Sequence, residues 1–376
     1  MSAVGKAEGV PIILLGLGNV GQALLRQILG SAESLPRQAG LRLVPIALAD
    51  SGGVLFAPDG LPEEPLCAAL RAKADQRGLS GLPGSRPLDR LDRALIRGAI
   101  LVDATASTRT EPFLRAALEA GCGVVLANKH PLSGPWEKAR GFLLHPQLRY
   151  EATAGAGLPV IATLRYLIAT GDRVAAIEGC FSGTLGFLCA ELERDQPYAT
   201  AVAQARELGY TEPDPREDLS GRDVARKALI LSRTVRACSS DATGWAIDLA
   251  AIAVEPLYPD TLADVSVDAF LASASALNES YAARFAAARA GGQTLRYVAR
   301  IGPEGSSVGL VTVPQDSSLG ALRGPANYVA FRTERYHDVP LVISGPGAGP
   351  EVTAAGVFGD IVDLARGAGR ALDSWV

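Results

Sequence analysis

The chain has 376 residues, of which 48% are hydrophobic and 20% are charged, and its formal net charge is −4. This length has room for two domains of ordinary size, and the hydrophobic content excludes a disordered protein. Lys and Arg residues are scattered along the chain, which excludes a strongly basic surface for nucleic acid or an anionic membrane.

Cysteine usage and the N-terminal segment bear on the compartment. The five cysteines show no CxxC spacing, so we expect reduced thiols and neither a disulfide framework nor a zinc site. The apolar stretch near the N-terminus continues into a glycine-rich loop and lacks the small-residue cleavage site of a signal peptide. No apolar run reaches the roughly 18 residues that a membrane helix needs. We therefore expect a cytoplasmic protein.

The first 150 residues alternate between strand and helix patterns. Short apolar runs of the kind buried in a parallel sheet occupy residues 11–15, 41–49, 99–103 and 123–127. Helical spacing follows the first run at 22–29 and the third at about 112–120, and a polar region near 74–92 is rich in Pro and Gly. This alternation predicts βαβ units with right-handed crossovers, and hence a Rossmann-like, doubly wound α/β domain.

Beyond about residue 150 the pattern becomes that of a mixed α+β domain. Strand patterns occupy 174–181, 295–302 and 309–313, and long Ala-rich helical patterns occupy 160–170, 198–208, 221–237 and 279–290. The last segment has a strand from Pro340, a glycine loop and a helix from Val352 to Leu372, which we expect to return to the first domain. The predicted division is therefore 1–149 with 344–376, and 150–343.

A GxGxxG motif lies between the first strand and the first helix. Such a motif alone is a weak signal, but this strand–loop–helix context is the one in which it binds a dinucleotide. Gly16 permits the tight turn, Gly18 lets the backbone approach a pyrophosphate, and Gly21 allows close packing of helix on strand. The helix N-terminus, near Val20, then faces the negative phosphates. A plain structural turn is the alternative interpretation.

Polar residues follow the next strands of the predicted sheet. Asp50 ends the second strand, where an acid would bind the ribose 2′-hydroxyl of NAD and repel a 2′-phosphate. Its distance from the third glycine exceeds the usual ~20 residues, so the choice between NAD and NADP stays open. Thr105 and Lys129 follow two later strands, whose carboxyl ends line the ligand crevice. On spacing alone, Lys129 is equally well a solvated turn residue.

The densest polar segment is GYTEPDPREDLSGRDVARK, residues 209–227. Its prolines forbid a helix through the first half, so the acids there project from a rigid loop. A helix can begin near Ser220, and Asp223 and Lys227 then lie four residues apart on one face. An exposed salt bridge is the commoner fate of such a pair. The catalytic alternative is a lysine that gives a proton to an alkoxide formed by hydride transfer and takes it back in reverse.

Several of these stretches resemble homoserine dehydrogenases. The matching segments, in chain order, are GLGNVG (16–21), DATAS (103–107), ANKHP (127–131), EATAGAGLPV (151–160), FSGTLGF (181–187), GYTEPDPREDLSGRDVARK (209–227) and GPGAGPEVTAAGVFGD (345–360). The matches cover nearly the whole chain, and the 209–227 segment is highly specific. With this resemblance the catalytic interpretation of the lysine is favoured.

The resemblance implies a role for each matching residue. Lys227 would exchange a proton with the C4 oxygen of homoserine or aspartate semialdehyde, and Asp223 would orient Lys227 or the substrate hydroxyl. Glu212 and Asp218 would bind the substrate ammonium group, since a zwitterionic substrate needs an anionic partner. Gly183 and Thr184 would contact substrate from their loop, Lys129 would lie between nicotinamide and substrate, and Gly349 would close over the cofactor. The enzyme would serve threonine, methionine and isoleucine biosynthesis.

The resemblance also implies a metal site and an assembly. The Glu151 carboxylate and the carbonyls of Ala154, Ala156 and Leu158 would hold a sodium ion, and oxygen-only ligation suits a hard cation. The second domain would be catalytic and would form a homodimer. We expect a short monofunctional form, because many bacterial relatives carry a regulatory C-terminal domain or a fused aspartate kinase and neither follows or precedes these motifs here.

Two alternatives come from different classes of protein. Aspartate-semialdehyde dehydrogenase uses the same metabolite but needs an activated cysteine, and Cys122, Cys180 and Cys189 have no histidine nearby in sequence. A nucleotide-sensing protein with a Rossmann domain would not need Asp223 and Lys227 together with Glu212. We expect an NAD(P)-dependent dehydrogenase acting on a small molecule, with no nucleic-acid or membrane partner.

Overall fold

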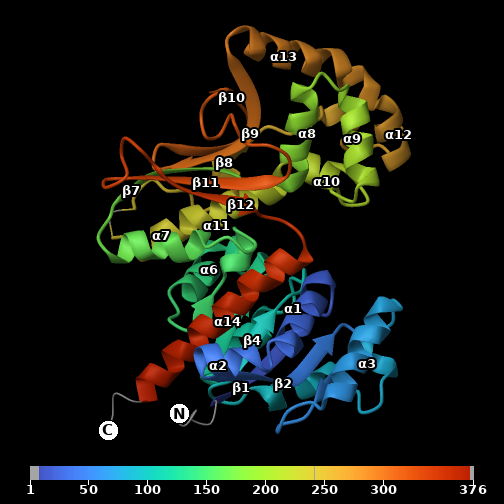
Figure 1. The fold of residues 1–376 in the computed structure, drawn as a ribbon, viewed down its shortest axis with the longest axis vertical. Coiled ribbons are helices and arrows are strands. Elements are labelled where there is room, and N and C mark those ends of the chain that lie inside the picture. The colour runs from blue at the N-terminus through green and yellow to red at the C-terminus, as the bar shows by residue number, and fades with distance from the viewer. Residues whose placement is uncertain (1–7, 241, 373–376) are drawn as a thin grey trace. The chain divides into compact units, whose positions relative to one another are not determined.

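A computed structural model of the protein describes residues 8–240 and 242–372 (Figure 1). Its internal contacts divide the chain into two compact units. Unit 1 combines the chain up to Gly157 with the segment from Gly349 onward, and unit 2 is Leu158–Ala348. The polypeptide therefore leaves the first unit and comes back to complete it.

Unit 1 is built on a six-stranded sheet with the order β3-β2-β1-β4-β5-β6. Its strands are β1 (Glu8–Leu15), β2 (Leu41–Asp50), β3 (Gly53–Phe56), β4 (Ile100–Asp103), β5 (Gly123–Leu126) and β6 (Leu148–Arg149). Neighbouring strands run parallel except for β3, which pairs antiparallel with β2 at one edge. The chain moves outward from β1 to β2 and then crosses to β4 on the other side. This confirms the doubly wound fold and places its switch point between β1 and β4.

Helices cover the sheet of unit 1. They are α1 (Asn19–Gly30), α2 (Ser34–Ala39), α3 (Glu63–Ala74), α4 (Glu111–Glu119), α5 (His130–Ser133), α6 (Trp136–Leu143) and α14 (Pro350–Leu372), with short 3-10 turns at Leu79–Gly81, Leu88–Ala94 and Glu151–Thr153. The last helix packs beside α1 (Figure 1). Val357 and Ile361 of α14 are fully buried in the same core as Ile12 and Leu24, so the final helix is part of the first core.

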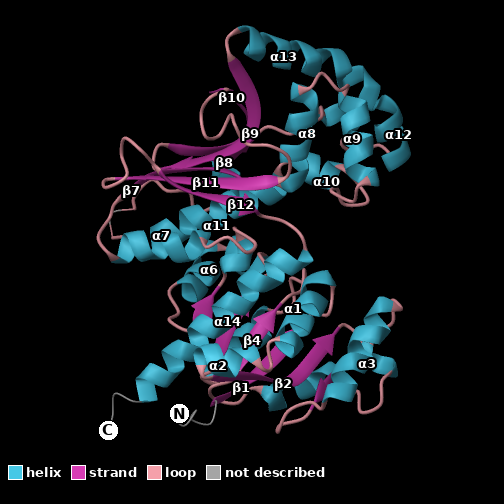
Figure 2. Cartoon of the chain, in the orientation of Figure 1, coloured by secondary structure: helices cyan, strands magenta, loops and turns pink. Residues whose placement is uncertain are grey.

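Unit 2 has its own six-stranded sheet, ordered β12-β11-β7-β9-β10-β8 (Figure 2). Its strands are β7 (Val174–Cys180), β8 (Ile252–Val254), β9 (Gln293–Gly302), β10 (Gly305–Pro314), β11 (Ala326–Thr333) and β12 (Leu341–Pro346). Pairing is antiparallel throughout, except that β8 runs parallel to β10. Strands distant in sequence thus become neighbours, and β7 lies between β11 and β9.

The helices of unit 2 pack on this sheet and on one another. They are α7 (Val160–Ala169), α8 (Gly183–Glu193), α9 (Tyr198–Glu207), α10 (Arg216–Leu219), α11 (Arg222–Cys238), α12 (Val267–Ser273) and α13 (Asn278–Ala290), with 3-10 turns at Leu249–Ala251, Asp260–Leu262 and Ala274–Leu277. Helix α11 packs on α7 and on β9 and β10, whereas α8 and α13 pack on β9. Val224, Ala228, Leu231 and Val235 form the apolar side of α11, each fully buried.

The start of α11 differs from the expected one. We predicted a helix that begins near Ser220, but a single helical turn, α10, comes first and the chain then breaks at Gly221. Gly221 has a left-handed backbone with φ of 69°, and a Cβ there would lie 2.0 Å from the Tyr297 hydroxyl. The break is therefore enforced by packing against β9. It turns the acidic loop away from the axis of the helix that carries Asp223 and Lys227.

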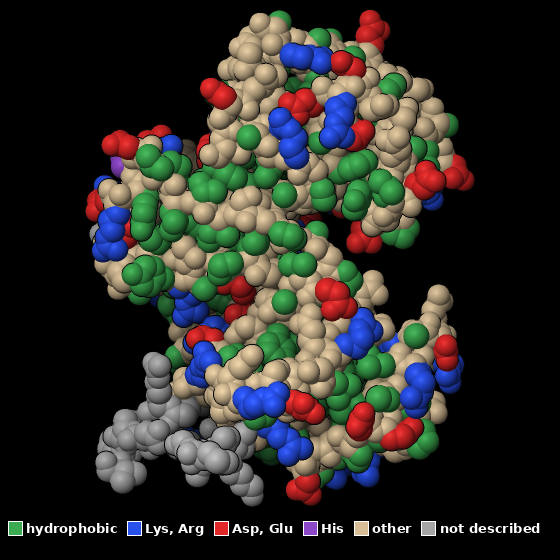
Figure 3. All heavy atoms as spheres, in the orientation of Figure 1, with side chains coloured by type: hydrophobic (Ala, Val, Ile, Leu, Met, Phe, Trp, Pro, Cys, Tyr) green, Lys and Arg blue, Asp and Glu red, His purple; other side chains and the backbone are tan. Residues whose placement is uncertain are grey.

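No helix among the described residues is long and apolar enough to cross a membrane. Figure 3 shows charged side chains of both signs interspersed over each unit. It also shows apolar side chains gathered over the part of unit 2 that holds β7, β11 and β12. Exposed apolar residues of that region include Val339 and Val342.

Candidate active site

Two of the three glycines in the first loop are required by packing within unit 1. Gly16 has φ of +90°, and a Cβ there would lie 2.7 Å from the Thr105 side chain and 2.9 Å from the Ala104 carbonyl carbon. At Gly21 a Cβ would lie 2.0 Å from the Gly16 carbonyl oxygen. Neither position accepts a side chain. The loop after β1 is therefore held tightly against the end of β4, at the switch point of the sheet.

Gly18 is under no such constraint. It has φ of −70° and ψ of −166°, which any residue adopts, and a Cβ there would meet no protein atom within 4 Å. Gly18 is the N-cap of α1, but no side chain caps the helix and no acid lies in its first turn, which includes Val20. The first-turn N–H groups are thus not neutralised by a carboxylate of their own helix, and such a terminus attracts an anion.

The carboxylate of Asp50 is bound within its own loop. Its Oδ1 accepts hydrogen bonds from the backbone N–H groups of Gly52 and Gly53 at 2.8 and 3.1 Å. Its Oδ2 accepts one from Leu79 at 3.0 Å and pairs with the ammonium of Lys73. Burial by itself would raise the pKa of Asp50, but the Lys73 ammonium and the N–H donors outweigh it and lower the pKa. A ribose hydroxyl would have to compete with these four donors.

Thr105 and Lys129 lie at neighbouring strand ends of unit 1. Thr105 follows β4, and its N–H and hydroxyl both donate to Asp103 Oδ1, at 3.0 and 2.7 Å. Lys129 follows β5 and is the N-cap residue of α5. The sequence patterns did not single out Asp103 or Asn128, which are 0% and 2% exposed and connect the two strand ends. The signal available in the sequence was a polar residue at the end of each of two apolar strand patterns.

The predicted cation loop begins at Glu151, which is buried in unit 1. Ala154 and Ala156 are buried too, and Ala156 has a left-handed backbone with φ of 55°. The N–H of Glu151 donates to Asp360 Oδ2 of α14 at 2.8 Å. Burial, together with the Glu151 charge, raises the pKa of Asp360 to about 8. Asp360 is a residue that sequence reasoning missed.

Two further predicted site residues, Leu158 and Gly349, lie where the chain passes from one unit to the other. Leu158 is the first residue of unit 2, and its carbonyl accepts the Val160 N–H at 2.8 Å. Gly349 is the first residue of the returning part of unit 1, with φ of +97° and no protein atom within 4 Å of a Cβ placed there. Its carbonyl accepts the Thr353 N–H at 3.0 Å, which starts α14.

In unit 2, the Lys227 ammonium is held at two points. Its Nζ lies 2.8 Å from Asp223 Oδ2 and donates to the backbone carbonyl of Phe181, just after β7, at 2.7 Å. The Lys227 side chain is 14% exposed, whereas that of Asp223 is 45% exposed. The pair is thus not a freely solvated salt bridge, because the amine end is largely desolvated and its direction is set by a strand-end carbonyl.

A second cluster adjoins this pair and includes Thr184 and Asp218. The Thr184 hydroxyl lies 2.5 Å from the Tyr210 carbonyl oxygen and 3.1 Å from Asp218 Oδ1. The N–H of Glu212 donates to Asp218 Oδ2 at 2.9 Å, while the Glu212 side chain is exposed. Burial, with the nearby charges of Asp223 and Glu217, raises the pKa of Asp218. Gly183 begins α8 beside Thr184. The predicted substrate residues of unit 2 are therefore brought together.

The loop that carries Glu212 and Asp218 is fastened by Arg216, which sequence reasoning also missed. Its guanidinium binds both carboxylate oxygens of Asp214, at 3.0 Å from Nε to Oδ1 and 2.7 Å from Nη2 to Oδ2. Its Nη1 donates to the backbone carbonyls of Leu262, Ala263 and Val265 at 2.6–3.2 Å. The alternating acids and arginine of PDPRED were the only signal in the sequence.

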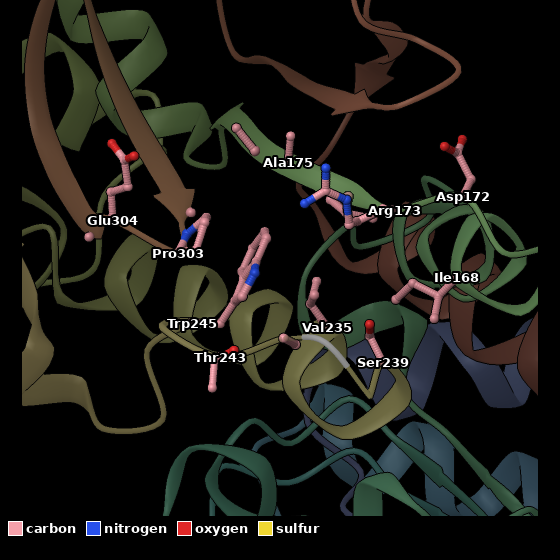
Figure 4. A pocket seen from close by; sticks show the side chains of 15 residues that line it. Ile168, Asp172, Arg173, Ala175, Val235, Ser239, Thr243, Trp245, Pro303 and Glu304 are labelled. Atoms are coloured by element: carbon pink, nitrogen blue, oxygen red, sulfur yellow. The ribbon is translucent and has the colours of Figure 1, made fainter.

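Unit 2 also contains a cavity of about 510 Å³ (Figure 4). Trp245, Arg173, Asp172 and Glu304 are among the residues that line it, from the start of β7, the β9–β10 turn and the segment after α11. Its lining contains none of the predicted substrate residues. This cavity has no titratable pair held in place for proton transfer, so it is a weaker candidate for the active site than the lysine cluster.

The five cysteines are free thiols, and three of them, Cys122, Cys180 and Cys189, are buried. Burial raises the pKa of Cys122 and of Cys189 to about 11, and it also raises the pKa of Cys180. A thioester-forming enzyme needs a thiol whose pKa is lowered. The thiol-based alternative therefore finds no support in these residues.

Comparison with known families covers both units. The family model described as "Homoserine dehydrogenase" matches residues 159–362, and the one described as "Homoserine dehydrogenase, NAD binding domain" matches residues 16–141. A homoserine dehydrogenase of Paracoccidioides brasiliensis is 38% identical over 282 residues, which is 71% of this chain and 74% of that protein. The chloroplastic bifunctional aspartokinase/homoserine dehydrogenase 2 of Zea mays is 37% identical over 94% of this chain. The chain spans 38% of the length of that bifunctional relative.

Solved structures agree with the fold. A Candida auris protein of unknown function has a TM-score of 0.80 and 31% identity, covering 96% of this chain and 99% of its own. A putative homoserine dehydrogenase of Archaeoglobus fulgidus has a TM-score of 0.73 and 25% identity, covering 95% and 99%. A hyperthermophilic archaeal homoserine dehydrogenase in complex with NADPH has a TM-score of 0.71 and 23% identity, covering 96% and 98%. At that identity the last likeness concerns the fold alone.

Proposed function

The chain belongs to the homoserine dehydrogenase family, and from that premise we propose that it catalyses the reversible reduction of L-aspartate 4-semialdehyde to L-homoserine with a nicotinamide dinucleotide. The observation that carries this proposal is the Lys227 ammonium, largely desolvated and fixed by Asp223 and the Phe181 carbonyl. A thiol-based reaction on the same metabolite is disfavoured by the raised pKa values of the buried cysteines.

Lys227 supplies the proton that balances the reaction. The cofactor, when bound, delivers hydride to the C4 carbonyl carbon, or accepts it from homoserine in reverse. In the reducing direction the C4 oxygen becomes an alkoxide and takes a proton from the Lys227 ammonium. In the oxidising direction the neutral amine accepts the hydroxyl proton. Asp223, at 2.8 Å, holds the ammonium in place while the carbonyl of Phe181 sets its direction.

Asp218, Glu212, Gly183 and Thr184 bind the amino-acid part of the substrate in this proposal. The two carboxylates match the substrate ammonium. Asp218 is partly buried and anchored by Thr184 and by the Glu212 N–H, so its position is defined before substrate arrives. A preformed anionic partner of this kind selects an α-amino acid over a simple aldehyde.

Unit 1 binds the dinucleotide in this proposal. The pyrophosphate lies over the loop that contains Gly16, Gly18, Val20 and Gly21, and the open surroundings of Gly18 support this. Thr105, Lys129 and Gly349 contact the cofactor from their strand and helix ends, Lys129 at its nicotinamide end, and Asp50 lies at the end of β2 expected to face the adenosine ribose. We propose NAD or NADP as this dinucleotide, and one structural neighbour is in complex with NADPH.

We further propose a sodium ion at the Glu151 carboxylate and the carbonyls of Ala154, Ala156 and Leu158. The Glu151 side chain is buried, and its charge contributes to the raised pKa of Asp360, so a hard cation bound there would relieve the repulsion between the two carboxyl groups. Replacing sodium by a large organic cation should then lower activity, and Glu151→Gln should remove that dependence.

The proposed assembly is a homodimer formed by unit 2. Apolar side chains gather over β7, β11 and β12, and Val339 and Val342 are exposed (Figure 3). Light scattering should give about twice the chain mass, and Val342→Asp should shift it toward one chain. The free thiols fit a reducing compartment, and we propose the cytoplasm.

The test of the proposed function is an assay with the wild-type chain and two lysine-helix variants. Purified protein should oxidise NADH or NADPH when given aspartate semialdehyde, and a comparison of initial rates gives the preferred cofactor. Lys227→Ala should lower turnover by about 10²–10⁴-fold with dinucleotide affinity nearly unchanged. Arg222→Ala, an exposed cation at the start of the same helix, is the control. Loss of dinucleotide binding in Lys227→Ala, or wild-type turnover, would contradict the assignment.

A further inference from the structure

The carboxyl ends of β4 and β5 are joined by a buried polar cluster made of Asp103, Thr105, Thr110 and Asn128. Asp103 is the last residue of β4 and is 0% exposed. Its Oδ1 accepts the N–H and hydroxyl of Thr105, and its Oδ2 accepts the Thr110 hydroxyl at 2.6 Å and the Asn128 amide at 3.0 Å. None of these four donor groups is charged, so the hydrogen bonds to this buried carboxylate come from neutral groups.

Asn128 is the connection from this carboxylate to the next loop. Its side chain is 2% exposed, and its Nδ2 donates to Asp103 Oδ2 and to the Ser107 carbonyl, at 3.0 and 2.8 Å. Its Oδ1 accepts the backbone N–H of His130 at 3.0 Å. The amide therefore spans Lys129, which lies between Asn128 and His130 and is the N-cap of α5.

The charge of Asp103 sets the direction of this amide. An ionised carboxylate only accepts hydrogen bonds, so it draws the NH₂ group of Asn128 toward itself. The Asn128 oxygen is then turned toward the His130 N–H, which fixes the backbone on the far side of Lys129. The carbonyl of Lys129 in turn accepts the N–H groups of Leu132 and Ser133 at 3.1 and 3.0 Å. Its main chain is thus held from both directions.

We propose that Asp103 and Asn128 are positioning residues that aim Lys129 in the reaction. This inference rests on the proposed function, in which Lys129 contacts the cofactor at its nicotinamide end. A buried carboxylate costs free energy compared with an apolar residue, so stability alone gives no reason for an acid at position 103. Fixing one amide orientation beside a functional lysine gives such a reason, because small displacements of a reacting group lower turnover steeply.

The experiment is a double-mutant cycle between Asn128 and Lys129 in the full chain. Asn128→Ala should lower kcat by about 10–100-fold, with little change in dinucleotide affinity or in the semialdehyde KM. In a Lys129→Met background the same change should lower kcat by less than about threefold, because a residue that acts through Lys129 has nothing left to position. Asp103→Asn should follow Asn128→Ala in both backgrounds.

Thr110→Val is the matched control, since it removes the bonds of the Thr110 hydroxyl to Asp103 Oδ2 and to the Asn128 amide but keeps the Asn128 amide and its bond from the His130 N–H. It should lower the Tm while kcat stays within about threefold of wild type. The inference is overturned if Asn128→Ala affects kcat no more than Thr110→Val does, or equally in both backgrounds. Wild-type turnover in Lys129→Met would instead remove the assigned role of Lys129, even if the Lys227 and aspartate semialdehyde assays succeed. Normal kcat in Asn128→Ala with an impaired Lys129→Met would overturn only the positioning.

Discussion

Gly16 and Gly18 stand two residues apart, but their α-hydrogens face different surroundings. A Cβ at Gly16 would meet Thr105 at 2.7 Å in a left-handed backbone, whereas one at Gly18 would meet no protein atom within 4 Å. The fold thus explains the first glycine and leaves the second to be explained by a ligand. We therefore infer that Gly18 is a glycine because a phosphate of the dinucleotide comes close to the backbone there.

Alanine substitutions should separate these two roles. Gly18→Ala should leave the Tm within a degree or two but weaken dinucleotide binding by about tenfold or more, about 1.4 kcal/mol. Gly16→Ala should destabilise the protein by about 1–3 kcal/mol through backbone strain and the Thr105 contact. Thermal unfolding measures the stability of each variant, and a titration followed by dinucleotide fluorescence measures its affinity for the dinucleotide. A Gly18→Ala protein with unchanged affinity would contradict the proposed pyrophosphate contact.

Asp218 gives the site a pH dependence. Burial and the charges of Asp223 and Glu217 raise its pKa above the ordinary aspartate value. As pH falls, the carboxylate that we propose binds the substrate ammonium is therefore protonated at a higher pH than a free aspartate would be. Below that pKa, kcat/KM for homoserine should fall by about tenfold per pH unit, mainly through KM. Asp218→Asn should have a low kcat/KM at all pH values and should not show this decrease at acidic pH. An unchanged decrease in Asp218→Asn would mean that another group causes it.

At the scale of elements, the acidic loop owes its shape to Arg216. The guanidinium joins Asp214 to three carbonyls of the 262–265 segment. Lysine keeps the charge but cannot reproduce the planar fork of donors. Arg216→Lys should cost about 1–3 kcal/mol of unfolding free energy and raise the homoserine KM, with dinucleotide affinity unchanged. Arg222→Lys, on the exposed side of the next helix, should change neither quantity.

Sequence periodicity predicted most elements because each has one buried face or is a short buried run. The strands at β1, β2, β4, β5, β7 and β9 and the helices α7, α9, α11 and α13 lie where the patterns placed them. Helix α8 was missed because it is buried nearly all round and shows no amphipathic period. Strand β11 was missed because it is buried on both faces and lacks alternation.

Pairing and contact were harder to predict than elements. The position of β7 between β11 and β9 joins segments more than a hundred residues apart, which a single sequence does not reveal. The same holds for Asp103 and Asn128, whose side chains meet across 25 positions. The Lys227 and Asp223 pair was predictable because side chains four positions apart on one helix lie close together. What the spacing could not tell is the third partner, the Phe181 carbonyl.

For the whole molecule, stability of unit 1 depends on the end of the chain. Ile361 of α14 is fully buried in the core that contains Ile12 and Leu24. Ile361→Ala should cost about 2–5 kcal/mol. In calorimetry, Ile361→Ala should lower the Tm of the unfolding transition whose Tm is raised by bound dinucleotide, since a ligand stabilises the unit that binds it. Leu229→Ala, fully buried in α11, is the counterpart in unit 2. An unmoved dinucleotide-sensitive transition in Ile361→Ala would contradict this.

The interrupted course of unit 1 has a consequence for biosynthesis. Ribosomes deliver α1, β4 and β5 before unit 2, but α14, which packs on these elements, leaves the exit tunnel only after all of unit 2 has been translated. A nascent chain thus holds an exposed apolar sheet surface while the inserted unit, Leu158–Ala348, has every one of its own strands available. The later-made unit can therefore finish folding first, and the earlier-made one waits for the last helix to emerge.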